Sequence, residues 1–245
     1  MQNPIHFLPI VTTVVAIPFG IKLFRHWRRK PDSMYLLWWM IGVLTYAVGT
    51  FTESMTSLLG WNPVVFRAWY ISGALLGGAP LAQGTVYLLM RRRIADRMTI
   101  AICSFITVAA VFVLLSPLDT SLVETYRLSG RVLNWQWVRF FSPFINTYAV
   151  IFLVGGAILS AWRYARVDRA YSRRMWGNIF IAVGAVLPGI GGGSARAGYV
   201  EVLYVTELLG LALIWLGYRT IVGDVSRSIH ANQARDGQTV AQTST

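Results

Sequence analysis

The sequence has too few charged residues for a chain that folds in water. Only 13% of its 245 residues are Asp, Glu, Lys or Arg, whereas a soluble domain carries roughly 25%. Hydrophobic residues make up 55% of the chain, and the mean hydropathy is +0.53. This shortage excludes an ordinary soluble enzyme or binding domain, and it predicts that lipid is the solvent for most of the chain.

Cysteine and histidine are also scarce. The single cysteine, Cys103, lies in an apolar run, which excludes an internal disulfide and the cysteine clusters that bind zinc or iron–sulfur groups. The three histidines, His6, His26 and His230, lie near a helix end, in a loop and in a polar tail. Their positions argue against paired axial ligation of a haem inside the membrane. We therefore predict neither a metal site nor a cofactor.

Lysine is almost absent, and several chemistries are excluded with it. The only lysines, Lys22 and Lys30, lie at the inner end of the first predicted helix, so no lysine is placed to hold retinal within the bundle. The motifs of zinc proteases, serine hydrolases and nucleotide-binding loops are missing as well. The sequence leans away from an enzyme and names no catalytic residue. The net charge of +12 is explained by basic loops against anionic lipid head groups, so we predict no nucleic-acid partner.

Long apolar runs, in contrast, are abundant. A hydrocarbon core about 30 Å thick needs about 20 apolar residues per helix. Seven runs meet this requirement, which predicts an all-α, polytopic membrane protein with a seven-helix transmembrane domain over residues 1–222. The predicted helices are 5–24, 34–59, 64–90, 98–116, 137–162, 174–192 and 199–222. Residues 223–245 are polar and weakly patterned, so they are predicted to form a disordered cytoplasmic tail.

The distribution of basic residues predicts the orientation. Seventeen of the 22 Lys and Arg residues fall in the first, third and fifth loops and the tail. Those loops are therefore predicted to lie inside, with the N-terminus outside and the C-terminus inside. We expect a multi-pass protein of the plasma (inner) membrane. The long outer loop, 117–136, has Ser129-Gly130 between two β-capable runs, so a hairpin lid and an irregular loop are both compatible with it.

A weak internal repeat accompanies this pattern. An offset of 135 residues places seven identities in the 23 positions from 27 to 49, including Gly42 on Gly177 and Gly49 on Gly184. The repeat predicts a parallel 3+1+3 arrangement, in which the fourth helix is a linker. That topology is similar to SWEET-type sugar transporters, but the chain lacks their adjacent Pro-Gln pair, since Pro80 and Gln83 are three residues apart. The similarity is architectural and does not fix a function.

Charged residues inside membrane spans are costly, so they are the first candidates for a functional site. Glu53 and Arg67 lie seven residues on either side of Gly60, which places both about 10 Å from the turn between the second and third helices. We predict that they pair. An ion pair that joins the two helices is the structural alternative to a role in ligand binding.

Two further groups lie in the predicted outer half. Arg139 and Asn146 belong to a polar stripe on the fifth helix, although Arg139 is equally compatible with snorkelling to the interface. Glu207 lies about 12 Å inside the outer end of the seventh helix, with Tyr204 on the same face. A carboxylate at that depth requires a partner, a proton or a wet cavity, and Arg139 is the partner we expect.

Together these residues predict a polar pocket open to the outer half of the membrane. Its predicted ligand-binding residues are Glu53, Arg67, Arg139, Asn146, Tyr204 and Glu207. The leading hypothesis is a transporter or sensor that binds a small or amphipathic molecule. The alternatives are an intramembrane lipid-modifying enzyme that uses Glu53 and Glu207 as an acid/base pair, and an accessory subunit of a larger membrane complex. A homo-oligomer is compatible with each of them.

Overall fold

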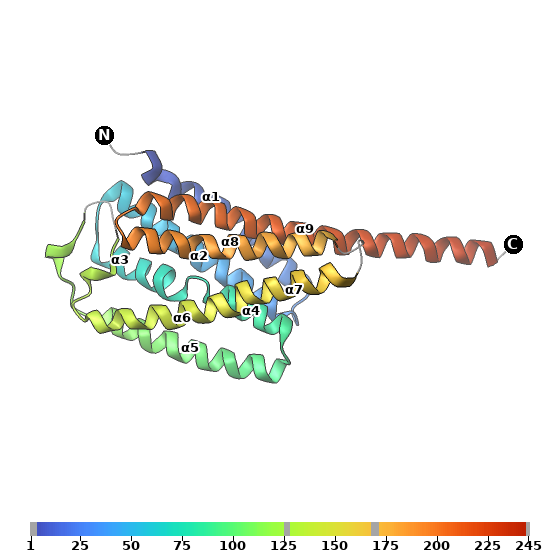
Figure 1. Ribbon diagram of the computed structural model, residues 1–245, viewed down its shortest axis with the longest axis horizontal. Coiled ribbons are helices and arrows are strands. Elements are labelled where there is room, and N and C mark those ends of the chain that lie inside the picture. The colour runs from blue at the N-terminus through green and yellow to red at the C-terminus, as the bar shows by residue number, and fades with distance from the viewer. Residues whose placement is uncertain (1–3, 125–127, 168–171, 244–245) are drawn as a thin grey trace.

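The computed structural model describes residues 4–124, 128–167 and 172–243, which form a bundle of long helices lying side by side (Figure 1). Within these residues, seven helical segments are long and apolar enough to cross a membrane. This confirms the predicted all-helical, multi-pass architecture. The orientation stays a prediction. Arg169, counted on the inner side, and Arg127, counted on the outer side, lie outside the described residues.

The helical elements follow the predicted spans closely. Spans one and two are α1 (Leu8–Arg29, preceded by η1, Pro4–Phe7) and α2 (Met34–Leu59). Span three comprises α3 (Pro63–Trp69), η2 (Tyr70–Leu76) and α4 (Ala79–Leu89), and span four is α5 (Arg92–Leu115). Span five comprises η5 (Gln136–Phe140), α6 (Phe141–Ala149), η6 (Val150–Val154) and α7 (Gly155–Val167). Spans six and seven are α8 (Ser172–Arg196) and the start of α9 (Val200–Thr243).

Helices α8 and α9 pack along a seam of glycines. A Cβ atom built on Gly184 would lie 2.6 Å from the carbonyl oxygen of Gly210, and one built on Gly217 would lie 2.4 Å from that of Gly177. The α8 glycines, Gly177 and Gly184, are seven residues apart, as are Gly210 and Gly217 on α9. Two turns of a helix return a residue to the same face, so the spacing keeps the glycines in the contact and lets the two backbones touch.

The glycines that match in the predicted repeat make similar contacts in the structure. Gly42 and Gly49 of α2 also lie against the span that follows them, Gly42 on Leu81 and Gly49 on Gly73. The other members of the comparison differ, because span three is interrupted and span seven is a continuous helix. The 3+1+3 arrangement therefore stays a prediction.

Span three is interrupted near its middle. It begins at Asn62, whose side chain accepts hydrogen bonds from the backbone N–H groups of the first turn, with a proline at the first helical position. After a π-helical turn, η2, the chain breaks at Gly77, which has φ +29, and restarts as α4 with Pro80 in its first turn. Only glycine adopts this backbone conformation readily. Because Gly77 and Gly78 have no side chains, the wall of the bundle is thin at the break.

The loop between α5 and span five is irregular in its described part. It contains two 3-10 turns, η3 (Thr120–Leu122) and η4 (Gly130–Val132), and an isolated antiparallel bridge between Leu118 and Leu133. The described part of the loop therefore matches the irregular alternative. Residues 125–127 lie outside the described residues. Leu133 is fully buried and packs with the apolar side chains beneath it, so the loop covers one end of the bundle. We call this end the outer end, after the predicted orientation.

A polar network holds α5 to the bundle at the opposite end. Only 17% of the apolar window of α5 is buried, so few apolar contacts secure it. The buried side chain of Gln83 on α4 donates to Thr99 Oγ1 at 2.7 Å and accepts from Tyr148 Oη. Thr99 donates to Tyr87, which in turn donates to the carboxylate of Asp96 at 2.7 Å. These bonds link α4, α5 and α6.

Helix α9 continues beyond its membrane span. From Gly223 to Thr243 it leaves the bundle as a single helix (Figure 1). A polar helix without tertiary packing is only marginally stable in water. The disorder predicted for 223–245 therefore stays a prediction.

Cysteine labelling will test the predicted orientation. After the native Cys103 is replaced with serine, single cysteines at exposed Thr120 and Arg93 mark opposite ends of the bundle. Cysteine at 120 should react with a membrane-impermeant maleimide added to intact cells, and cysteine at 93 should react only after the cells are permeabilised. The reverse pattern would invert the topology, while labelling of both in intact cells would show that the basic loops do not fix it.

Candidate functional site

A cavity of about 880 Å³ lies in the outer half of the bundle. Its walls come from α2, span three, span five, α8 and α9, and residues of the outer loop line its mouth. The interruption of span three forms part of one wall, since Gly73, Gly77 and Gly78 contribute little side-chain volume there. The volume is that of a site for a small organic molecule.

Glu53 lies on the α2 wall of this cavity and is 4% exposed. It is held by Trp69 on α3, whose indole Nε1–H donates to Glu53 Oε1 at 2.9 Å. Its second oxygen, Oε2, is buried and receives no hydrogen bond from an N–H or hydroxyl group of the described residues. A buried carboxylate oxygen without a donor is costly, which makes Glu53 a functional candidate.

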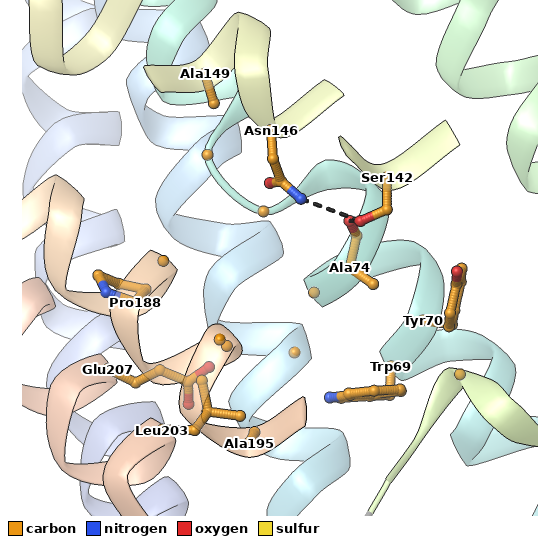
Figure 2. A pocket seen from close by; sticks show the side chains of 18 of the residues that line it. Trp69, Tyr70, Ala74, Ser142, Asn146, Ala149, Pro188, Ala195, Leu203 and Glu207 are labelled. Atoms are coloured by element: carbon orange, nitrogen blue, oxygen red, sulfur yellow. Dashed lines mark hydrogen bonds between the residues drawn. The ribbon is translucent and has the colours of Figure 1, made fainter. Parts of the chain in front are cut away.

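Glu207 approaches Glu53 from α9. Figure 2 shows Glu207 pointing into the cavity, with the indole of Trp69 on the opposite wall. The two carboxyl groups lie within hydrogen-bonding range of each other. The backbone carbonyl of Glu207 accepts a hydrogen bond from Tyr46 Oη at 3.0 Å, which ties this turn of α9 to α2. The cavity thus contains two facing carboxyl groups, part-way between its mouth and the deeper apolar residues Leu81, Leu153 and Ile214; we call this acidic part the floor. Apart from the other carboxyl group of the pair, the buried Oε2 atoms of Glu53 and Glu207 have no hydrogen-bond partner among the described residues.

The predicted pair of Glu53 and Arg67 is wrong. Arg67 Nη2 donates to the backbone carbonyl of Ser116 at 3.0 Å, at the outer end of α5, and Arg67 is not among the residues that line the cavity. The two residues do lie at similar depth, but depth does not fix the direction of a side chain around a helix. In the short helix α3, Arg67 faces α5 whereas Trp69, two residues later, faces α2.

The expected pair of Glu207 and Arg139 is also absent. Arg139 Nη1 donates instead to Gln136 Oε1 at 2.7 Å, one turn earlier, at the mouth of the cavity. Among the described residues, no Lys, Arg or His forms an ion pair with Glu53 or Glu207. The carboxyl pair is therefore without a counter-charge from the part of the chain that the structure describes.

The polar stripe of span five does line the cavity. Ser142 Oγ donates to the carbonyl of Ala74 at 2.8 Å, a carbonyl of the irregular η2 segment. Asn146 Nδ2 donates to Ser142 Oγ at 3.0 Å, as drawn in Figure 2. Ser142 thus gives the carbonyl of Ala74 a hydrogen bond near the break of span three. The side-chain carbonyl of Asn146 remains as an acceptor beside Gly77.

The remaining predicted residue, Tyr204, also lines the cavity. It is 3% exposed and lies on α9 one turn before Glu207, with its ring edge-on to His6 of η1 at 6.1 Å. Five of the six predicted residues therefore line one cavity. Sequence reasoning missed Trp69. Tyr46 could be placed on the face of α2 that carries Glu53, one helical step from Gly49, but it was not among the predicted ligand-binding residues.

The site has the groups to bind a ligand and few of those needed for covalent chemistry. Within the described residues, no group of three His, Cys, Asp or Glu side chains is arranged to hold a metal ion. The floor offers carboxylate, amide and backbone carbonyl acceptors, and the mouth offers arginines. No protein-family model matches this chain, and no curated protein is significantly similar to it.

Proposed function

We propose that this membrane protein binds a small or amphipathic ligand in the outer-half cavity, as a transporter or a sensor. The facing carboxyl groups of Glu53 and Glu207 carry this proposal. Burying two acidic side chains at a cavity floor without a counter-charge is unfavourable for folding, although the two carboxyl groups can hydrogen-bond each other. Such a cost is typical of a binding or catalytic site, where the unsatisfied groups act on a ligand.

The other residues have roles that follow from their positions. Trp69 orients the carboxyl group of Glu53 by donating a hydrogen bond to it. Tyr46 donates to the backbone carbonyl of Glu207 and so fixes the turn of α9 that carries the second acidic side chain. Asn146 and Tyr204 form side walls, and Arg139 lies at the mouth. Arg67, which contacts α5, has a structural role in this proposal.

A lipid-modifying enzyme is the second candidate, because one observation favours it. Two carboxyl groups in hydrogen-bonding range can divide the roles of general acid and general base. Incubation of the purified protein with extracted lipids, followed by mass analysis, separates this candidate from simple binding, since only an enzyme changes the masses over time. The third candidate, an accessory subunit, predicts instead that the chain is unstable when purified alone.

We also propose that the protein lies in the plasma (inner) membrane with its basic loops against anionic lipid head groups. The loop residues Arg91, Arg92 and Arg93 and the end of α1 are exposed, as contact with a lipid surface requires. A homo-oligomer or a larger complex remains compatible with this placement.

Retention of small molecules during purification will test the proposed function. Gly192 lines the cavity, and a Cβ built there meets nothing within 4 Å, so Gly192→Trp should fold and fill the cavity. Native mass spectrometry should detect a bound molecule on the wild-type protein and at least 10-fold less on Gly192→Trp.

Gly155→Trp is the matched control. Gly155 is exposed, its Cβ also meets nothing within 4 Å, and it does not line the cavity. This variant should retain the molecule as the wild type does. Equal occupancy in all three proteins would show that the cavity is not where the molecule binds.

A further inference from the structure

The cavity opens sideways between span five and α8. Its lining includes Phe140 and Val150, which are 69% and 58% exposed, and on the facing helix the exposed Gly189 and Gly193. A residue that lines a cavity and is also exposed lies on its rim. Both rims are apolar and lie within membrane spans, so this opening faces lipid.

The packing of the helices explains the opening. Helix α8 packs closely on α7 and η6, the inner part of span five, and has no comparable contact with α6. The two spans therefore meet at the inner end and separate toward the outer end (Figure 1).

The α8 wall of the opening is built from glycines that no packing contact requires. Cβ atoms on Gly189, Gly192 and Gly193 would meet nothing within 4 Å, whereas Cβ atoms on Gly184 and Gly191 of the same helix would collide with α9. Glycine costs stability in a helix interior relative to alanine. These three glycines are therefore not needed for helix packing. Because they have no side chains, they leave room beside the α8 backbone for a ligand with a hydrocarbon chain.

The charges differ along the cavity. The floor has the carboxyl groups of Glu53 and Glu207, whose buried Oε2 atoms have no hydrogen-bond partner outside the pair among the described residues. The mouth has three arginines, Arg131, Arg139 and Arg196, of which Arg139 bonds Gln136. A ligand that replaces the bond between the two carboxyl groups must bring hydrogen-bond donors, and it must bring positive charge to balance them when both are ionised. Entry of such a cation past the arginines through the aqueous mouth is unfavourable.

We propose that the ligand is an amphiphile with a primary ammonium head group, and that it enters from the outer leaflet between α6 and α8. The ammonium lies between Glu53 and Glu207, and the hydrocarbon chain leaves along Gly189 and Gly193 into the bilayer. This inference rests on the proposed function and adds the ligand class and the route. An ammonium has three donors for the acceptors at the floor and stays protonated at neutral pH.

An inorganic cation fits the same floor less well. Within the described residues the carboxyl pair has no third His, Cys, Asp or Glu to complete a coordination shell, and hard cations take six or more oxygen ligands. The cavity is also far larger than an ion, and its lipid-facing opening would serve no purpose for one.

Binding of matched probes in lipid nanodiscs will test the head group and the chain. Radiolabelled dodecylamine should bind the wild-type protein above the level seen with empty nanodiscs. Unlabelled dodecanol, which has the same chain without the charge, and butylamine, which has the head without the chain, should each compete at least 10-fold more weakly than dodecylamine. Equal competition by dodecanol would overturn the ammonium assignment, and equal competition by butylamine would overturn the lipid-facing route.

Two variants test the residues and the route. Glu207→Gln should weaken dodecylamine binding at least 10-fold and leave the weak dodecanol binding unchanged, while a general loss of fold would reduce both. Val150→Trp, at the rim on span five, should slow dodecylamine binding several-fold without changing butylamine; equal rates would reject the side entrance. If Gly192→Trp releases a retained molecule that has no amine, the cavity binds a ligand as proposed and this inference alone fails.

Discussion

Replacing Glu53 with leucine should destabilise the protein more than replacing Glu53 and Glu207 with leucine together. The single change leaves the Glu207 carboxyl without its neighbour and removes the acceptor of the Trp69 indole. We expect a loss of about 2–4 kcal/mol in the free energy of unfolding. The double change removes both acidic groups and leaves only the indole unsatisfied, for a loss of about 1–2 kcal/mol.

A double-mutant cycle in mixed detergent micelles will measure this coupling. The interaction energy between the two positions should be about 1–3 kcal/mol, because the double variant should lose less stability than the sum of the two single losses. Glu53→Gln should lie within about 0.5 kcal/mol of the wild type, because the amide keeps an acceptor for Trp69 and adds a donor toward Glu207. Glu201→Leu is the control: its carboxylate lies 3.5 Å from His6 and is 37% exposed, so it should cost little. Additive losses at 53 and 207 would show that the two carboxyl groups act separately.

Gly184→Ala should destabilise the protein, although it adds only a single methyl group. That methyl would lie 2.6 Å from the carbonyl oxygen of Gly210 and 3.0 Å from the backbone nitrogen of Ile214. Neither is a flexible group that can move aside, so α8 and α9 must separate. Overpacking of this kind costs about 1–3 kcal/mol, and thermal unfolding followed by circular dichroism will report it.

Gly189→Ala in the same helix is the matched control. Its methyl group meets nothing within 4 Å, and alanine is the better helix former, so this variant should gain roughly 0.5–1 kcal/mol. If both variants gain stability equally, helix propensity and not the contact with α9 decides the outcome at these glycines.

The membrane spans could be predicted from sequence because their signal is local. The second predicted helix, 34–59, has the observed bounds, and the others differ only at their ends. Run length and hydropathy depend on neighbouring residues alone. The interruption of span three was harder to see, since Gly77-Gly78 followed by Pro80 is compatible with close helix packing as well as with a break.

The partners of the charged residues could not be predicted, because they depend on which spans are neighbours. Glu53 and Glu207 are 154 positions apart in the sequence, and nothing in the local pattern of α2 or α9 indicates that these two helices touch. Arg67 is the basic residue nearest to Glu53 along the chain, which made them the natural pair. Tertiary packing determined instead that a tryptophan lies beside Glu53 and that Arg67 meets a backbone carbonyl.

The glycine seam makes the bundle unequally stiff. Sliding α8 along α9 by one residue, about 1.5 Å, would drive the side chains next to Gly184 and Gly210 into backbone that now has no room for them. The two helices therefore resist shear and behave as one block. Span five has no such interlock at its outer end, and it contains a π-helical turn, η6, where its backbone register changes. Mechanical compliance is thus concentrated on one side of the cavity, so α6 is the part that yields when the volume between it and the α8–α9 block changes.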